Sequence, residues 1–552
     1  MKKKSLKKRI IALTLTAVLS LGLIGCSSAN DEARDHHRDY TSPVSTDAPA
    51  AVDGGGNYNY KMTMGNYSMA ATEGVAYDQQ QEQIQWNTEE YKYIDENGWK
   101  VVSVSPFSTF AADVDTASYA NLRRMITRNQ SIPADAVRIE ELINYFKYDY
   151  KAPTGSDPFS ITTELAPCPW NDKTQLLLVG IKAKDIDMSQ RKPSNLVFLV
   201  DVSGSMNGAD RLGLVQDSFK MLTDELDEND RISLVTYASG DRVVFEGLTG
   251  ADKKEITEKV EDLFASGGTN GSAGIQTAYE IAEKYFIEGG NNRIILATDG
   301  DLNIGITDEG SLTKLVKEKA KSGVEMSVLG FGWGNISDTR METLADNGNG
   351  NYSYIDSMNE ARKVLVDEMG GTLFTVAKDV KFQLEFNPAT VKGYRQIGYE
   401  NRAMAAEDFA DDTKDGGEIG AGHNVTVLYE IALKDSEQEL PEIDSKYSKI
   451  TADDNATGEY LTVNIRYKAP DGDTSTLIEK AVDGAVFSEK MSENMSWAAG
   501  VAQAGMLIRK SEYAGTSNMD DVIERLSELE CTREDDYRKE FCELMKKVNI
   551  GQ

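Results

Sequence analysis

A short apolar run that ends in polar side chains sets the strongest limit on how this chain folds. Residues 196–200 (Leu-Val-Phe-Leu-Val) are hydrophobic and partly β-branched, which is typical of a strand buried on both faces of a parallel sheet. The run ends at Asp201, and Ser203 and Ser205 follow with Gly204 between them. Hard cations prefer oxygen ligands, and glycine permits a tight turn. We therefore expect the three oxygen-bearing side chains to converge on a cation at this strand end.

Two later segments supply further oxygen donors. A glycine-rich loop at residues 266–271 carries Thr269 and precedes an expected helix. A second expected buried strand, at residues 292–298, ends in Thr298-Asp299-Gly300. Together with the first motif, they resemble the metal-ion-dependent adhesion site of a von Willebrand factor type A (vWA) domain. The resemblance implies that five residues hold Mg²⁺, or alternatively Mn²⁺ or Ca²⁺: Asp201, Ser203, Ser205, Thr269 and Asp299.

Residues 193–376 alternate between expected strands and helices, which favours a doubly wound, mostly parallel α/β sheet. Ligands of such sheets bind at the carboxyl ends of the strands, where the strand order reverses. The carboxyl ends of the two buried strands carry Asp201 and Asp299, so the expected fold and the motif agree. A loop at residues 330–335 lies at the same end, and we expect its Trp333 to contact a partner.

The flanking segments predict a β-sandwich into which the vWA domain is inserted, because the strands before the insertion are too few to bury a sheet face alone. Both flanks resemble regions found beside vWA domains in a group of bacterial proteins. The expected parts are a signal peptide (1–25), a tether (26–102), a helical segment (103–155), sandwich strands (156–192), the vWA domain (193–376), the remaining sandwich (377–479) and a helical region (480–552).

The N-terminus has the features of an export signal. A basic stretch at residues 1–9 precedes an apolar stretch at residues 10–25, the pattern of a secretory signal peptide. Leu23-Ile24-Gly25-Cys26 resembles the bacterial lipobox, which implies cleavage before Cys26 and lipidation of its thiol. We therefore expect a lipid-anchored protein on the extracytoplasmic face of the cell membrane. Residues 27–102 are polar and interrupted by glycine and proline, so we expect a flexible tether.

Charge and composition narrow the function. The formal net charge of the 552-residue chain is −31, which argues against nucleic acid as a partner. The resemblance implies a non-enzymatic adhesion or protein-binding module whose partner supplies an Asp or Glu carboxylate to the metal. Two alternatives stay open, namely a structural envelope component with a vestigial metal site and a metal-dependent hydrolase. The hydrolase lacks an evident general base, because none of the three histidines of the chain flanks the motif and Asp301 is the spare acid near it.

Several single residues also carry predictions. Asp113 and Asp115 precede a helical pattern and Asp135 precedes another, so we expect helix caps rather than metal ligands. His423 is expected in a turn. A helix after Thr532 is expected to begin with a capping box. Cys531 and Cys542 would lie about 16 Å apart on one continuous helix, so we expect both thiols to be free.

Overall fold

The computed structural model of this chain describes residues 88–112, 115–187, 191–300, 309–414, 416–442, 458–470 and 472–548. The predictions for the signal peptide, Cys26, Asp113 and Asp301 lie outside these ranges. In the described part of the chain, no helix combines the length and hydrophobicity that crossing a membrane requires.

A six-stranded sheet forms the centre of the vWA domain, in the order β10-β9-β8-β5-β6-β7. Every neighbouring pair is parallel except β6 and β7, which are antiparallel. The apolar run of β5 is buried throughout, because the strand lies between β8 and β6 and has helices on both faces. The strands are β5 (Ser194–Asp201), β6 (Arg231–Tyr237), β7 (Asp241–Thr249), β8 (Asn291–Thr298), β9 (Glu325–Phe331) and β10 (Tyr352–Ile355).

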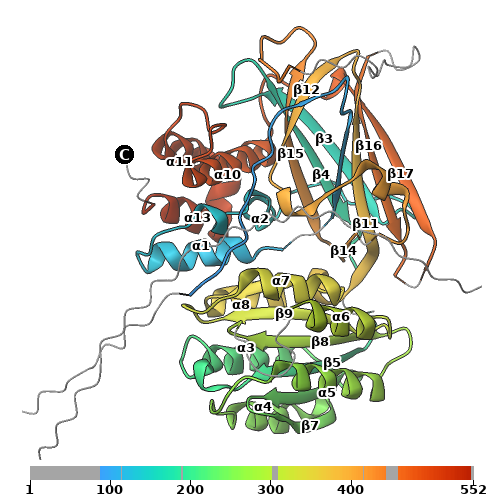
Figure 1. Cartoon of the computed structure of the whole chain (residues 1–552), viewed down its shortest axis with the longest axis vertical. Helices are drawn as coiled ribbons and strands as arrows, with labels where there is room; N and C mark the ends of the chain where they lie inside the picture. Colours follow the sequence, from blue (N-terminus) through green and yellow to red (C-terminus); the bar gives the residue numbers. More distant parts are fainter. Residues whose placement is uncertain are drawn as a thin grey trace, which may run out of the picture. The chain divides into compact units, whose positions relative to one another are not determined.

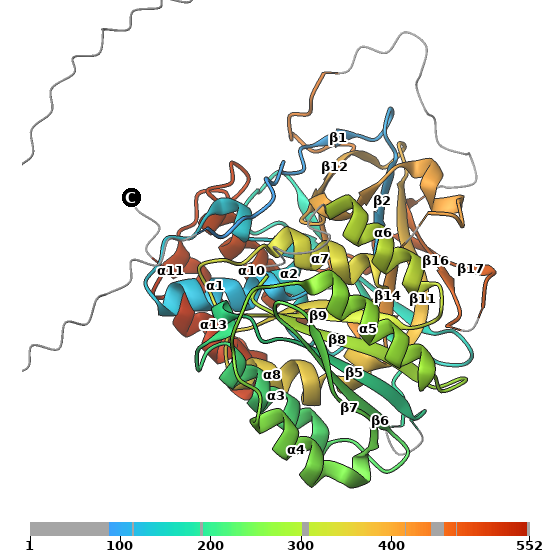
Figure 2. The same cartoon turned by 60° about the horizontal axis from the view of Figure 1, so that its bottom comes forward.

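Helices cover both faces of this sheet (Figures 1 and 2). One hydrophobic cluster joins the sheet to α3 (Leu212–Asp224), α4 (Lys253–Glu261), α8 (Met358–Arg362) and α9 (Met369–Leu373). A second cluster on the other face joins it to α5 (Gly271–Lys284), α6 (Glu309–Ala320) and α7 (Asp338–Asn347). A π-helical turn, Lys363–Asp367, connects α8 to α9. The expected doubly wound α/β fold is confirmed.

Two further sheets form the β-sandwich, with a shared hydrophobic core between them. One has the order β1-β12-β15-β4-β3 and the other β13-β2-β11-β16-β17, with β14 paired to β11. Strands β3 and β4 precede the vWA domain and β11 follows it, so the vWA domain is inserted in the sandwich as expected. The strands are β1 (Lys100–Val101), β2 (Phe107–Ala111), β3 (Phe159–Pro167), β4 (Gln175–Ala183), β11 (Thr375–Phe386), β12 (Val391–Ile397), β13 (Ala403–Met404), β14 (Gly417–Gly420), β15 (Asn424–Leu433), β16 (Glu459–Lys468) and β17 (Ser475–Asp483).

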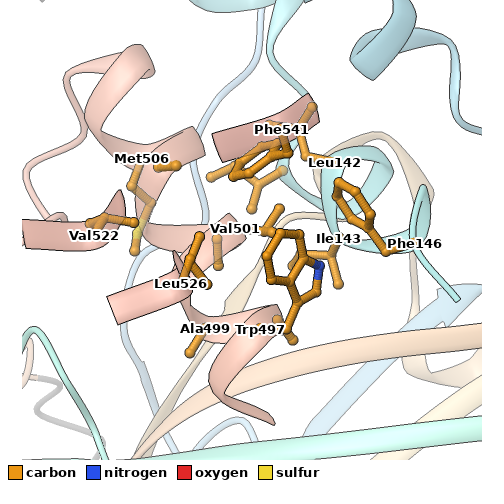
Figure 3. Packing of buried hydrophobic residues seen from close by; sticks show 14 of the residues in the cluster. Leu142, Ile143, Phe146, Trp497, Ala499, Val501, Met506, Val522, Leu526 and Phe541 are labelled. Atoms are coloured by element: carbon orange, nitrogen blue, oxygen red, sulfur yellow. The ribbon is translucent and has the colours of Figure 1, made fainter. Parts of the chain in front are cut away.

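A helical layer combines the segments before and after the sandwich. Its core places Leu142, Ile143 and Phe146 against Trp497 and Phe541 (Figure 3). The ring of Phe146 meets the Trp497 ring edge to face, with 4.9 Å between the ring centres. The helices are α1 (Ala117–Thr127), α2 (Ile139–Asn144), α10 (Glu493–Arg509), α11 (Met519–Glu528), α12 (Glu530–Glu534) and α13 (Asp536–Met545).

The sequence-based boundaries need three corrections. Residues 88–102 do not belong to a free tether, because they contact the folded body and include β1. The segment 103–155 is not purely helical, since β2 lies between β11 and β13. Strand β17 crosses the expected boundary between residues 479 and 480. In the first two cases, the pairing partners lie about 290 and 270 residues further along the chain, too far for local patterns to indicate.

The expected helix caps at Asp115 and Asp135 are wrong. Asp115 is buried and accepts a hydrogen bond from the Tyr352 amide (2.9 Å) while it pairs with Arg402 (2.9 Å). Asp135 accepts a hydrogen bond from the Ile94 amide (3.0 Å). Both carboxylates therefore join distant segments instead of capping their own helices.

The C-terminal prediction is partly right. Thr532 lies within α12, and Asp535 caps α13 by accepting hydrogen bonds from two amides. Cys531 and Cys542 lie on these two separate helices and are free, as predicted. His423 lies in the turn before β15, as expected, but its side chain is half-buried with a buried Nε2 atom, and loss of hydration lowers its pKa to about 4.

Candidate metal centre

The site lies where the strand order of the vWA sheet reverses. From the central strand β5, the chain continues on one side to β6 and later returns on the other side as β8. Asp201 is the last residue of β5, and Asp299 directly follows β8. Both carboxylates are fully buried. Because these neighbouring parallel strands end at the same edge, the fold brings together two acids that are 98 positions apart in the sequence.

The loop after β5 is shaped by hydrogen bonds to Asp201. The Ser203 amide donates to Asp201 Oδ1 (2.8 Å), which turns the chain back over the strand end. The hydroxyl oxygens of Ser203 and Ser205 lie 2.9 Å apart. Ser203 is buried and Ser205 is half-buried. The structure thus brings the first three predicted ligands together, with two hydroxyls beside one carboxylate.

Thr298 fixes the other side of the Asp201 carboxylate. Its hydroxyl donates to Asp201 Oδ2 (3.1 Å) and accepts a hydrogen bond from the Gly300 amide (3.1 Å). Gly300 has a φ angle of 92°, a conformation that favours glycine. Thr298 belongs to the sequence motif, but no role was predicted for it. Its position at a strand end, directly before Asp299, was the available signal.

The two acids interact electrostatically. Burial raises the pKa of Asp201 to about 7, and the charge of Asp299 contributes further in the same direction. Hydrogen bonds from Ser203 and Thr298 lower the pKa of Asp201, but by less than burial and Asp299 raise it. Bringing two carboxylates together in a dry environment is unfavourable unless positive charge compensates them.

The loop that carries Thr269 packs against the serine loop. Gly267 accepts a hydrogen bond from the Gly204 amide (3.0 Å) through its carbonyl oxygen, and the Ser266 amide donates to the Val202 carbonyl (2.7 Å). Thr269 itself is buried. All five predicted ligands therefore lie on loops or strand ends that contact one another.

Two segments that lead into the loops of the site carry aromatic side chains. Trp333 is half-buried, and the guanidinium of Arg128 lies 4.8 Å from the centre of its ring. Arg128 also pairs with Asp210 on the loop after β5, at 3.0 Å. On the Thr269 loop, Phe264 is 70% exposed although its neighbour Leu263 packs against the core. Phe264 was missed by the sequence analysis, because a single phenylalanine gives no sign of its exposure.

The segment of residues 88–91, named the strap here, is bound to the Trp333 loop. The Thr88 amide donates to the Gly334 carbonyl (2.8 Å), and the Gly334 amide donates to Glu89 Oε1 (2.9 Å). Glu89 pairs with Arg124 of α1 at 3.0 Å, and both side chains are only 3% exposed. These residues were predicted to belong to the tether, because a strap held by contacts with remote residues has no local sequence signature.

The donor set fits a hard divalent cation. Two carboxylates and the hydroxyls of two serines and a threonine offer oxygen only, which suits Mg²⁺, Mn²⁺ or Ca²⁺ better than softer metals. Within the described ranges, no three His, Cys, Asp or Glu side chains gather where they could hold a metal ion. A cation at this site would therefore depend on the hydroxyls as well as on the two acids.

Comparison with known families supports the fold assignment. The family described as "von Willebrand factor type A domain" matches residues 195–367. The family described as "von Willebrand factor" matches residues 85–178, and the one described as "Uncharacterized protein YfbK, C-terminal" matches residues 371–550. A solved structure, "von Willebrand factor type A from Catenulispora acidiphila", covers 70% of this chain and 89% of its own, with 16% identity and a TM-score of 0.40.

Individual relatives match over different lengths. Human inter-alpha-trypsin inhibitor heavy chain H4 is 29% identical over 165 residues, which are 28% of this chain and 18% of that protein. YfbK of Escherichia coli (strain K12) is 43% identical over 466 residues, which are 83% of this chain and 81% of that protein. The match to YfbK includes most of both proteins and not the vWA domain alone. The chain therefore belongs to the YfbK family of vWA-domain proteins.

Proposed function

We propose that this protein is a lipid-anchored, metal-dependent adhesion or protein-binding module of the cell envelope. The observation that carries the proposal is the all-oxygen cluster at the reversal point of the vWA sheet. There, Ser203 and Ser205 lie beside the buried carboxylate of Asp201, with Asp299 next to it. We infer that these residues and Thr269 hold Mg²⁺, or Mn²⁺ or Ca²⁺ in its place.

The chain's own residues would bind and orient the ion. The carboxylates supply negative charge, and the serine and threonine hydroxyls supply neutral oxygen. Asp201 is held in place by the Ser203 amide and the Thr298 hydroxyl, so it needs little rearrangement to bind. A bound cation would supply a Lewis-acidic position for an Asp or Glu carboxylate of a partner protein, because Mg²⁺ tends to keep exchangeable positions in its coordination shell.

The surface around the site supports protein binding. Phe264 exposes an aromatic ring on one loop, and Trp333 offers part of its ring on another. Aromatic side chains are enriched among the residues that dominate protein interfaces. The proposed partner therefore presents a carboxylate beside apolar side chains.

The proposed lipid anchor is inferred from the sequence of the first 26 residues. A lipidated Cys26 would hold the chain on the extracytoplasmic face of the membrane, since buried acyl chains supply the membrane affinity. The residues between Cys26 and the strap would then connect the membrane to the folded body.

One experiment on the full chain in its own cells tests both halves of this proposal. The protein is captured from solubilised membranes after mild crosslinking, either in Mg²⁺ or in EDTA. We expect a partner protein to be captured in Mg²⁺ and lost in EDTA. The same loss is expected for Asp201→Ala, and Cys26→Ser is expected to move the protein out of the membrane fraction.

Asp241→Ala is the matched control, because Asp241 is an exposed carboxylate at the start of β7 in the same domain. This variant should capture the partner as the wild type does. Equal capture in EDTA and by Asp201→Ala would contradict metal-dependent binding. A rise in melting temperature with Mg²⁺, without any metal-dependent partner, would favour the alternative of a structural envelope component.

A further inference from the structure

A buried tyrosine lies directly beside the candidate metal centre. Tyr237 is the last residue of β6 and pairs in register with Asp201, the last residue of β5. Paired residues of neighbouring strands point to the same face of a sheet. Tyr237 is fully buried, and its hydroxyl makes no well-aligned hydrogen bond within the described ranges, although the side chains of Asp201 and Thr298 lie close enough to interact with it. A buried polar group without a well-aligned partner calls for an explanation, such as a ligand or ion that completes the site.

The surroundings of this hydroxyl are acidic. The side chains of Asp201 and Thr298 both lie close enough to interact with the Tyr237 hydroxyl, and Asp299 lies near it. A tyrosine hydroxyl can donate a hydrogen bond to a carboxylate. The Asp201 carboxylate already accepts one hydrogen bond on each oxygen, from Ser203 and Thr298. A carboxylate has about four acceptor positions, so it can accept a third donor.

The ring of Tyr237 is fixed by its packing. Helix α5 crosses the ring at Gly274, where an added Cβ would lie only 2.9 Å from the Cβ of Tyr237. The Tyr237 carbonyl accepts a hydrogen bond from the Val202 amide (2.9 Å), and the next carbonyl, of Ala238, accepts one from the Asn270 amide (2.6 Å). Tyr237 thus contacts the serine loop and the Thr269 loop through its backbone, while its side chain packs against α5.

We infer that Tyr237 is a positioning residue of this metal centre, whose hydroxyl donates a hydrogen bond to the Asp201 carboxylate when the cation is bound. This inference rests on the proposed function. The hydrogen bond would orient Asp201 and keep its charge directed at the ion. Groups that orient metal ligands in this way typically change metal affinity by about 10–100-fold when they are removed.

Replacing Tyr237 by phenylalanine tests the inference, because the change removes only the hydroxyl. Mg²⁺ affinity is measured by calorimetry on the folded protein, and the melting temperature is measured in EDTA. We expect Tyr237→Phe to bind Mg²⁺ about 10-fold more weakly than the wild type. We expect at most a small decrease in the melting temperature of the metal-free protein, since the hydroxyl makes no well-aligned hydrogen bond there.

Tyr279→Phe is the matched control. Tyr279 belongs to the same hydrophobic cluster, is equally buried, and has a hydroxyl that likewise lacks a partner in the described part of the chain. It lies on α5, and its pKa is influenced by Glu283 and not by the site acids. This variant should bind Mg²⁺ with wild-type affinity.

Two results would overturn the positioning role of Tyr237 and leave the proposed metal site standing. One is unchanged Mg²⁺ affinity in Tyr237→Phe, and the other is an equal loss of affinity in Tyr279→Phe. A lower melting temperature with unchanged affinity would assign Tyr237 a structural role and also overturn the inference. If the wild type binds neither Mg²⁺ nor Mn²⁺, the proposed metal site fails, and the role of Tyr237 fails with it.

Discussion

The buried carboxyl groups of this protein differ in the hydrogen bonds that they accept. Asp201 receives hydrogen bonds on both carboxylate oxygens and has a second acid beside it. Glu140 of α2 is also buried, but its Oε2 has no hydrogen-bond partner within the described ranges. Burial raises the pKa of Glu140 to about 8, and the charges of Glu400 and Glu141 add to the effect. Glu140 is therefore protonated in the folded protein at neutral pH.

The raised pKa of Glu140 should make the free energy of unfolding depend on pH. An unfolded chain ionises Glu140 above its ordinary pKa of 4.5, whereas the folded chain keeps the proton up to about pH 8. Its contribution to the free energy of unfolding is therefore fully present below pH 4.5. That contribution decreases between these two values, by about 1.4 kcal/mol per pH unit. We expect Glu140→Gln to remove this slope, as measured by denaturant unfolding from pH 5 to pH 8.

Glu385→Gln serves as the control, because Glu385 is exposed on β11. Its stability should follow the pH profile of the wild type. Parallel profiles for Glu140→Gln and the wild type would show that Glu140 keeps an ordinary pKa in the folded protein.

At the scale of elements, the strap joins the Trp333 loop to helix α1. Glu89 accepts a hydrogen bond from the Gly334 amide and pairs with Arg124, and both charged side chains are buried. Removing one partner of a buried ion pair leaves the other charge uncompensated, at a cost of about 3 kcal/mol. We therefore expect Glu89→Ala to destabilise the protein by about this amount. Hydrogen–deuterium exchange of residues 332–337 should become faster.

The adjacent residue offers a control for the strap. Glu90 has an exposed side chain. Within the described residues, it contacts the same loop through its backbone, whose amide donates a hydrogen bond to the Ile336 carbonyl (3.0 Å). Glu90→Ala should therefore leave both stability and exchange unchanged. If Glu89→Ala behaves like Glu90→Ala, the buried ion pair does not hold the strap in place.

Elements with local patterns were predictable, and elements with remote partners were not. The buried strand at residues 196–200 is apolar throughout, so its sequence indicates β5 directly. Strand β2 reads Phe-Ser-Thr-Phe-Ala and forms because β11, about 270 residues later, pairs with it. The candidate site was also predictable only where its residues form a local motif. The motif residues identify the cluster, whereas the roles of Tyr237 and Glu89 arise from contacts with remote residues, which no local pattern indicates.

At the scale of the whole molecule, buried and half-buried ion pairs link the inserted domain to its surroundings. Arg138, before α2, pairs with Asp338 (2.7 Å) and Glu342 (2.8 Å) on α7 of the vWA domain. Arg402, between β12 and β13, pairs with Glu342 (2.7 Å) and Asp346 (2.7 Å) on the same helix. Helix α7 follows the Trp333 loop, so the sandwich and the helical layer both support the helix that borders the candidate site.

Calorimetric titration of Mg²⁺ into protein freed of divalent ions tests the central claim, which is that five oxygen donors form one cation site. We expect one Mg²⁺ bound per chain, and a higher melting temperature in Mg²⁺ than in EDTA. We also expect that binding is lost in Asp201→Ala and retained in Asp241→Ala. Wild-type protein that binds no divalent cation, or Asp201→Ala protein that binds Mg²⁺ as tightly as the wild type, would contradict the presence of this cation site.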